Sequence, residues 1–152
     1  MSVNASQQPT QGSAFASLTP LIEPRSVAVV GASSDPNRIG GRPIAYMLRH
    51  GFTGRILPVN PNRSEIQGLP AFASVDALPE APDVAIIAVP AAQVLETVQA
   101  LGRKGARSAI VFSSGFSEVG GEGVHMQDAI VEAARAANMR LLGPNALGVF
   151  NL

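Results

Sequence analysis

Small and polar residues follow an apolar run near the start of the chain, in an order that could bind phosphate. The run VAVV at residues 27–30 leads directly into GASS at residues 31–34, and a glycine pair follows at residues 40 and 41. The run predicts a strand, and the glycines predict a tight loop before a helix that begins near Pro43. Such a loop directs backbone N–H groups toward an anion at a helix N-terminus. The pattern therefore predicts a site for a phosphate-bearing cofactor, without identifying that cofactor.

The loop departs from the dinucleotide-binding pattern G-x-G-x-x-G, because Ser33 stands where the second glycine would be. The segment after the second predicted strand, NPNR at residues 60–63, lacks the Asp or Glu that binds the ribose of NAD. Arg63 suits an extra phosphate on the adenosine ribose instead. NADP carries that phosphate on the 2′-oxygen, and coenzyme A carries it on the 3′-oxygen. A solvated surface cation is the plain alternative for Arg63.

Two further loops carry polar groups after predicted strands. Residues 112–115 (FSSG) offer hydroxyls and a close backbone approach, but Phe112 stands where a nucleophile elbow requires glycine. Residues 143–145 (GPN) form a sharp turn after the last predicted strand. A plain turn is the alternative interpretation of both segments. We assign no catalytic residue and no metal ligand.

The composition limits the classes of function. The chain has 152 residues, enough for one domain, of which 46% are hydrophobic and only 5% aromatic. Eleven basic and eleven acidic residues balance, which argues against a nucleic-acid partner bound by bulk charge. The absence of cysteine excludes disulfides and thiolate metal sites. No segment approaches the roughly 18–20 apolar residues that span a bilayer, and the N-terminus lacks the features of a secretory signal. We expect a cytoplasmic protein without a membrane partner.

Alternating elements are expected to position these loops. Residues 1–17 are predicted to be a flexible tail, and residues 18–24 a lead-in to the domain. Strands are predicted over residues 26–30, 55–59, 84–89, 108–112 and 140–142. Helices are predicted over residues 42–50, 91–104 and 124–138, and residues 66–78 are expected to be irregular, with a short helical turn after Ser74. In the first helix we expect Ile44, Met47 and Leu48 to share one face and Tyr46 to pack.

Strands that alternate with helices predict an α/β fold of the Rossmann-like, doubly wound type. The expected sheet is mostly parallel, with about five strands and helices on both faces. Ligands of such sheets bind beyond the carboxyl ends of the strands, near the point where the strand order reverses. The glycine loop and the segments that follow the other strands are therefore expected to outline one site.

Five segments carry a resemblance to a known family: VAVVGASSDPNRIGG, GRILPVNPNRSEIQGLPAFASV, DVAIIAVPAAQV, AIVFSSGFSEVGGEG and LLGPNALGVFN. In this order and spacing they resemble the coenzyme A-binding domain of NDP-forming acyl-CoA synthetases. That family includes acetate–CoA ligase (ADP-forming) and relatives similar to the succinyl-CoA synthetase α subunit. The resemblance implies a coenzyme A-binding domain over residues 18–152. It also implies that the following residues bind coenzyme A: Gly31, Ala32, Ser33, Ser34, Pro36, Arg63, Val89, Pro90, Phe112, Ser113, Ser114, Gly115 and Asn145.

The resemblance further assigns roles along the coenzyme. The loop at residues 31–36 would contact phosphates and adenosine with Arg63 nearby, residues 89–90 and 112–114 would line the channel, and residues 143–145 would lie near the thiol. Ala146 stands where the family usually has Cys. The phosphohistidine and ATP-grasp parts of such ligases have no counterpart here, and His50 and His125 are expected to be exposed. We therefore expect a nucleotide-binding piece that needs the remaining ligase and ATP-grasp domains or subunit as partners to join acid, coenzyme A and nucleoside triphosphate into acyl-CoA.

Two alternatives stay open. One is an NADP-binding oxidoreductase domain, which would enhance NADPH fluorescence. The missing fingerprint glycine and the lack of a catalytic Tyr-Lys pair weigh against it. The other is a non-catalytic regulatory module that senses coenzyme A or acyl-CoA, which a natural chain of this length would favour.

Overall fold

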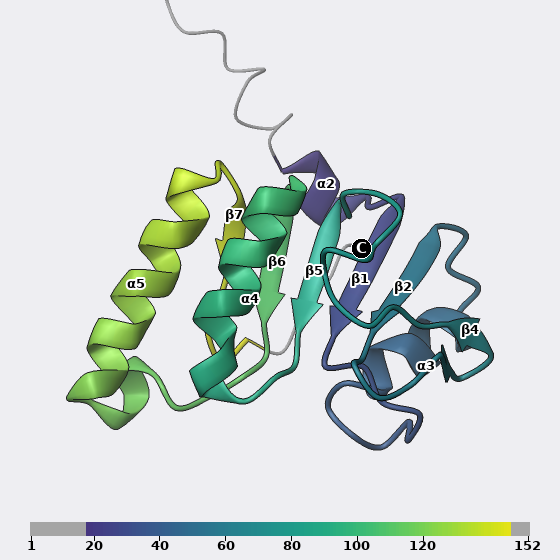
Figure 1. The fold of residues 1–152 in the computed structure, drawn as a ribbon, viewed down its shortest axis with the longest axis horizontal. Helices are drawn as coiled ribbons and strands as arrows, with labels where there is room; N and C mark the ends of the chain where they lie inside the picture. The colour runs from purple at the N-terminus through teal and green to yellow at the C-terminus, as the bar shows by residue number, and fades with distance from the viewer. Residues whose placement is uncertain (1–17, 147–152) are drawn as a thin grey trace, which may run out of the picture.

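A parallel sheet forms the middle layer of the molecule (Figure 1). The computed structural model describes residues 18–146. Across the five-stranded sheet the order is β2-β1-β5-β6-β7, and each neighbouring pair is parallel. The strands are β1 (Ser26–Val30), β2 (Arg55–Val59), β5 (Val84–Ile87), β6 (Ser108–Val111) and β7 (Arg140–Leu142). This arrangement confirms the predicted Rossmann-like α/β class.

Helices cover both faces of the sheet. On one face lie α4 (Ala91–Lys104) and α5 (Glu122–Ala136), which are in front of the strands in Figure 1, and on the other lies α3 (Arg42–Arg49). Alternate residues of β1 belong to two different cores, because successive side chains of a strand point to opposite faces of the sheet. Ala28 and Val30 pack in the core under α4 and α5, whereas Val27 and Val29 pack in the core under α3.

Helix α4 occupies the residues predicted for it. Val94, Val98 and Leu101 recur at helical spacing, and all three are fully buried against the sheet. The helix ends at Gly105, whose left-handed φ of 87° is the common way to terminate a helix. Helix α5 runs alongside it, two residues earlier in the sequence than predicted, and the remaining short helices are α2 (Thr19–Ile22) and η1 (Ser117–Val119).

The segment predicted to be irregular contains a small hairpin instead. Strands β3 (Glu65–Ile66) and β4 (Leu69–Pro70) are antiparallel, and both turn residues between them have positive φ, 52° at Gln67 and 81° at Gly68. Two consecutive residues of positive φ are typical of a two-residue hairpin turn. No helical turn follows Ser74 in this part of the described chain, which forms a simple turn at residues 75–78.

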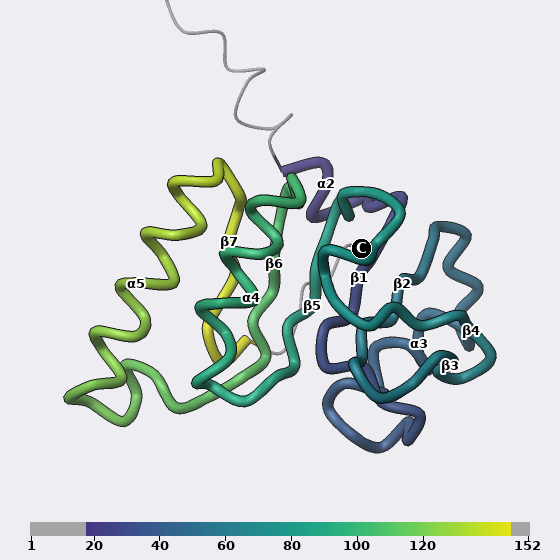
Figure 2. The backbone as a smooth tube through the Cα atoms, viewed as in Figure 1, coloured from purple at the N-terminus to yellow at the C-terminus, as the bar shows by residue number. Residues whose placement is uncertain are grey.

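The hairpin arises from tertiary contacts that a local pattern does not reveal. Ile66 is completely buried in the core under α3. The chain then returns beside β2, where the N–H of Phe72 donates to Pro58 O and the N–H of Asn60 donates to Phe72 O, each at 2.9 Å. Figure 2 shows the hairpin next to β2 and α3.

Several expectations about boundaries and packing were wrong. Strand β5 ends at Ile87 rather than residue 89, and β6 ends at Val111 rather than residue 112. Tyr46 is 54% exposed and Leu48 is 44% exposed, because the eight-residue α3 buries only the face that carries Ile44. The predicted flexible tail lies outside the described residues. No helix in residues 18–146 has the length and apolar character needed to cross a membrane.

Asp83 connects three strands at the amino edge of the sheet. Its carboxylate accepts hydrogen bonds from the backbone N–H of Arg25 at 3.0 Å and from Arg25 Nε at 3.3 Å. Its own N–H donates to Ser26 Oγ on β1, and its carbonyl accepts from Ser108 Oγ on β6 at 2.7 Å. These bonds align the starts of β1, β5 and β6, and therefore also the loops that leave their far ends.

Candidate functional site

The strand order reverses between β1 and β5. From β1 the chain moves to β2 on one side, and the later strands β5, β6 and β7 are added on the other side. The loops that follow β1 and β5 therefore diverge at the carboxyl edge, where they leave an opening. Figure 2 shows the connections after β1, β5 and β6 at this same end of the sheet.

The main cavity at this opening has a volume of about 560 Å³. It is lined by loop residues 31–35 and 38–40, with Asn60, Arg63 and Ala88. We call residues 31–41 the phosphate loop. Arg63, which follows β2, lies on the same cavity as the glycines that follow β1, as expected from the parallel pairing of these strands.

Glycine is required in the phosphate loop by close backbone approaches. Gly31 has a φ of +84°, and a Cβ there would lie 2.5 Å from the carbonyl oxygen of Ala88. A Cβ at Gly40 would lie 2.0 Å from Gly31 O, and one at Gly41 would lie 1.9 Å from Asp35 O. The loop therefore folds back tightly on itself, which explains the late glycine pair in the sequence.

The phosphate loop is held by one of its own side chains and by Asn60, yet keeps backbone donors without partners in the described part of the chain. The N–H of Asp35 donates to Ser33 Oγ at 3.1 Å, and Asn60 Nδ2 donates to Ala32 O at 2.8 Å. The backbone N–H groups of the cavity-lining residues Ser34, Ile39 and Gly40 have no hydrogen-bond partner among the described residues. Free N–H groups around a cavity are ligands for phosphate oxygens.

Two arginines supply positive charge to this cavity. Arg38 and Arg63 are the cationic side chains among the described residues that line it, and both are exposed. Arg38 Nε lies 3.9 Å from Asp35 Oδ2, a long contact between exposed groups that leaves the guanidinium available to a ligand. Arg38 was missed from the sequence, although a cation inside a phosphate-binding loop was the signal that could have identified it.

Three further cavities continue from the first. One of about 460 Å³ lies beside residues 88–90 and reaches Thr97 and Arg103 of α4. One of about 340 Å³ is lined by residues 88–91 and 112–114. The third, of about 220 Å³, is mainly apolar and includes Tyr46 and Ala146. Ala88 or Ile39 is shared between neighbouring cavities, so we call the set the carboxyl-edge groove.

Most of the residues predicted to bind the ligand lie along this groove. Pro36, Gly115 and Asn145 do not line it. The N–H of Asn145 donates to Ser113 O, and Ser113 itself is buried, with its Oγ donating to Val89 O at 2.5 Å. Ser113 therefore joins the ends of β5 and β6. The residues that line the groove as predicted are Gly31, Ala32, Ser33, Ser34, Arg63, Val89, Pro90, Phe112, Ser113 and Ser114.

Glu118 closes the loop that follows β6. Its Oε1 accepts a hydrogen bond from the N–H of Gly115 at 2.6 Å. This backbone hydrogen bond lowers the pKa of the Glu118 carboxyl below its ordinary value, because it favours the charged form. Gly115 thus supports the loop rather than the groove.

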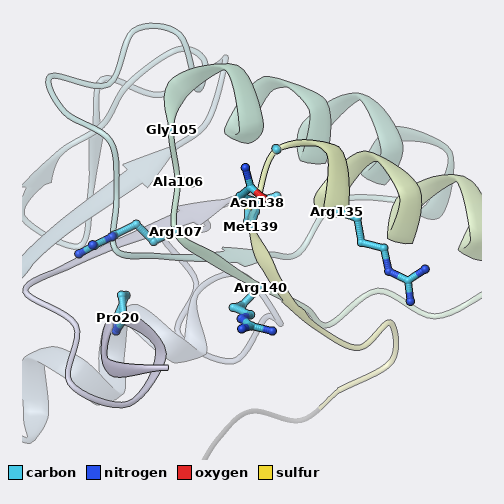
Figure 3. A pocket seen from close by; sticks show the side chains of 9 residues that line it. Pro20, Gly105, Ala106, Arg107, Arg135, Asn138, Met139 and Arg140 are labelled. Atoms are coloured by element: carbon cyan, nitrogen blue, oxygen red, sulfur yellow. The ribbon is translucent and has the colours of Figure 1, made fainter. Parts of the chain in front are cut away.

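A separate cavity of about 530 Å³ lies at the amino edge of the sheet, near Pro20 (Figure 3). Arg107, Arg135 and Arg140 line it, but Arg107 and Arg135 point away from each other in Figure 3, and Arg107 lies 3.8 Å from the carboxylate of Asp83. Helices α4 and α5 end here, so their dipoles disfavour an anion. This cavity is therefore a poor site for a phosphate, although its volume is similar to that of the cavity at the carboxyl edge.

The described residues provide no group of three metal-ligating side chains. His50 and His125 are exposed, as expected, and neither lines the carboxyl-edge groove. The groove therefore offers backbone donors, arginines and apolar walls, a set suited to binding a phosphorylated ligand with an apolar arm.

Comparisons with known proteins agree with this chemistry. A protein-family model described as a CoA binding domain matches residues 25–151. The α subunit of acetate–CoA ligase (ADP-forming) I from Pyrococcus furiosus is 40% identical over 137 residues, a match that covers 88% of this chain and 30% of that protein. The chain spans between 18% and 30% of the length of the curated relatives it matches.

Solved structures show the same domain in two settings. Acetyl-coenzyme A synthetase 1 from Ca. Korarchaeum cryptofilum, in its apo form, is 40% identical with a TM-score of 0.82, and the match covers 86% of this chain and 28% of that one. A conserved hypothetical protein from Pyrococcus furiosus is 28% identical with a TM-score of 0.61, and the match covers 78% of this chain and 91% of that one. The domain thus occurs within long chains and as nearly the whole of a short one.

Proposed function

This chain belongs to the CoA-binding domain family, and from that premise we propose that its carboxyl-edge groove binds coenzyme A for an NDP-forming acyl-CoA ligase. The family match confirms the resemblance carried by the five sequence segments. In the complete ligase, the proposed reaction joins an acid and coenzyme A at the expense of a nucleoside triphosphate. The bound coenzyme would supply the thiol that accepts the acyl group, and this chain would bind and orient it.

The residues of the groove fit such a ligand. The unpartnered N–H groups of the phosphate loop would bind the diphosphate, and the close glycine packing lets that backbone reach it. Arg63, with Arg38 on the same cavity, would bind the 3′-phosphate by charge-assisted hydrogen bonds. Residues 89–90 and 112–114 would line the path of the pantetheine arm. The family resemblance implies that its thiol would lie toward residues 143–145, next to Ala146, which lines the groove.

One observation supports this proposal most strongly. Arg63 and the free amides of Ser34, Ile39 and Gly40 line a single cavity at the point where the strand order reverses. The same cavity could bind the ribose phosphate of NADP, but the family match favours coenzyme A.

Isothermal titration calorimetry separates these ligands. The full 152-residue chain is titrated with coenzyme A, 3′-dephospho-coenzyme A and NADPH, and we expect binding in the order coenzyme A, then its dephospho form, with none for NADPH. Arg63→Ala should weaken coenzyme A binding by roughly 10- to 100-fold, because a hydrogen bond to a charged group contributes about 1.5–3 kcal/mol. The same variant should leave the dephospho form unaffected. Arg135→Ala, at the amino edge, is the matched control.

Absence of coenzyme A binding by the unaltered chain would refute the proposal. Equal affinity for coenzyme A and its dephospho form would remove the role of Arg63 only. Tighter binding of NADPH than of coenzyme A would favour the oxidoreductase alternative.

A regulatory module that senses coenzyme A is a second candidate function. The short solved chain from Pyrococcus furiosus favours it, because this domain makes up nearly all of that protein. The first candidate requires further ligase and ATP-grasp parts as partners, in keeping with the much longer curated relatives. Acyl-CoA formation by the natural protein with ATP and acetate would support the ligase, whereas coenzyme A binding without turnover would support the sensor.

A further inference from the structure

The hairpin of β3 and β4 contacts the phosphate loop through one side chain. Gln67 Nε2 donates to Ser33 O at 3.0 Å and to Gly41 O at 2.9 Å. These two carbonyls lie on either side of the segment that carries the unpartnered amides of the groove. We propose that Gln67 is a positioning residue that fixes the shape of the phosphate loop and so raises the affinity for coenzyme A; the inference rests on the proposed function.

The hydrogen-bonding capacity of Gln67 matches this role. A carboxamide nitrogen has two N–H donors, and the two carbonyls of the phosphate loop use both. Gln67 is half-buried, so water competes less well for these bonds than at an exposed site. Without the amide, nothing else among the described residues bridges Ser33 O and Gly41 O.

The backbone of Gln67 is unfavourable for its residue type. Its φ of 52° lies in the left-handed region, where glycine and asparagine are the usual residues. Glycine would fit this turn position with less strain, and Gly68 already occupies the neighbouring one. The turn itself therefore does not require glutamine. The two hydrogen bonds to Ser33 O and Gly41 O give a reason for glutamine at this position.

The hairpin does not depend on Gln67 for its own position. Ile66 is completely buried in the core under α3, and the N–H of Ala71 donates to Ser64 O at 2.9 Å across the hairpin. Removal of the Gln67 side chain should therefore leave the hairpin in place, while the bond from the Ser33 N–H to Gly40 O, at 3.3 Å, remains as a weaker link between the two sides of the phosphate loop. A less organised loop must be ordered by the ligand, which lowers affinity.

Gln67→Gly tests the inference because it removes the amide and relieves the backbone strain at once. Asn138→Gly is the matched control: Asn138 has the same φ of 52° but lies at the amino edge. For each variant of the 152-residue chain, urea unfolding gives the stability, and calorimetry gives the dissociation constants of coenzyme A and 3′-dephospho-coenzyme A. We expect Gln67→Gly to unfold at the same or a higher urea concentration and to bind both ligands about tenfold more weakly. Asn138→Gly should bind both as the unaltered chain does.

Gln67→Met supplies a second variant that keeps the length of the side chain without its donors, and it should also weaken both ligands. If the unaltered chain binds coenzyme A and both Gln67 variants bind it equally well, the inference is wrong while the proposed function stands. If the unaltered chain binds no coenzyme A, both are wrong. If both variants bind coenzyme A more weakly and also unfold at a lower urea concentration, Gln67 acts only through the stability of the fold. That result would also overturn the inference.

Discussion

At the scale of single residues, the site depends on backbone groups more than on side chains. The unpartnered donors at Ser34, Ile39 and Gly40 are main-chain N–H groups, and the glycines allow the close backbone approaches of this loop. Of the side chains, Arg38 and Arg63 place positive charge on the cavity, and Gln67 donates to two carbonyls of the loop. Substitutions in this loop should therefore affect binding even where no side-chain contact is lost.

Gly31→Ala should abolish binding and destabilise the fold. Its φ of +84° is strained for alanine, and the added Cβ would lie 2.5 Å from the backbone oxygen of Ala88. The left-handed conformation alone costs about 1–2 kcal/mol, so we expect a loss of at least about 2 kcal/mol in urea unfolding. Gly51→Ala is the control, because Gly51 has a φ of +68° with nothing within 4 Å. Equal losses in the two variants would show that the close approach to Ala88 is unimportant.

Glu118 should make the loop after β6 sensitive to acid. The hydrogen bond from the Gly115 N–H lowers the pKa of the carboxyl in the folded state. Because the pKa of Glu118 is lower in the folded than in the unfolded state, its ionised carboxylate contributes fully to stability above the unfolded-state pKa. That contribution is lost as the pH falls through the folded-state pKa. NMR titration should show the Gly115 amide resonance moving only below the ordinary glutamate pKa, and Glu118→Gln should remove that movement. A Gly115 amide that titrates identically in both proteins would contradict this assignment.

Residues differ in how far sequence alone could identify them. Gly31 and Arg63 were predicted to bind the ligand from their types and their places after strands, and both line the groove, whereas their contact with a ligand stays a prediction. Arg38 was missed although it lies inside the same loop. Gln67 could not be predicted, because its role depends on a hairpin of two two-residue strands that brings it to Ser33 and Gly41.

At the scale of elements, the ends of the strands decide what the groove contains. Strand β5 stops at Ile87, which leaves Ala88 free to line three of the four cavities and Val89 and Pro90 free to line two of them. The strand was predicted to continue because Ala88 and Val89 extend the apolar run. The Ala88 N–H still donates to Val30 O at 2.8 Å, but the chain then leaves the sheet and lines the groove. Long periodic elements such as α4 were predicted correctly, because burial of one face dominates their pattern.

Asp83→Ala should lower stability without changing ligand affinity. The variant removes the acceptor for two donors of Arg25 and loosens the start of β5. The exposed Arg25 side chain adds little, so the partly buried bond from the Arg25 backbone N–H accounts for most of the expected loss of about 1–2 kcal/mol. Urea unfolding and calorimetry with coenzyme A check the two halves of the prediction. A drop in affinity as large as the drop in stability would imply that the amino edge controls the groove.

At the scale of the whole molecule, the topology follows from simple rules. Right-handed parallel crossovers and alternating strands and helices suffice to predict a doubly wound sheet with its ligand at the carboxyl edge. The hairpin beside β2 was the exception, since short strands with one buried residue carry too little pattern. The chain as a whole has no net charge and so does not attract anions over long range. The arginines that line the groove would attract an anion only locally.

Coenzyme A should raise the melting temperature of the whole chain. A ligand at 100 times its dissociation constant stabilises the folded state by about 2.7 kcal/mol, which corresponds to roughly 5–10 °C for a domain of this size. Differential scanning calorimetry with coenzyme A, and with NADPH as the control, measures this shift. A larger shift with NADPH would contradict the assignment of the ligand.

The central claim is that coenzyme A binds in the carboxyl-edge groove, with its phosphates at the phosphate loop. Titration of the ¹⁵N-labelled chain with coenzyme A, followed through its backbone amide resonances, tests this most directly. We predict the largest changes at Ser34, Ile39 and Gly40, and none at Asn138. Changes centred on Asn138 and Arg140, with the phosphate loop unaffected, would place the ligand at the opposite edge of the sheet and contradict the account.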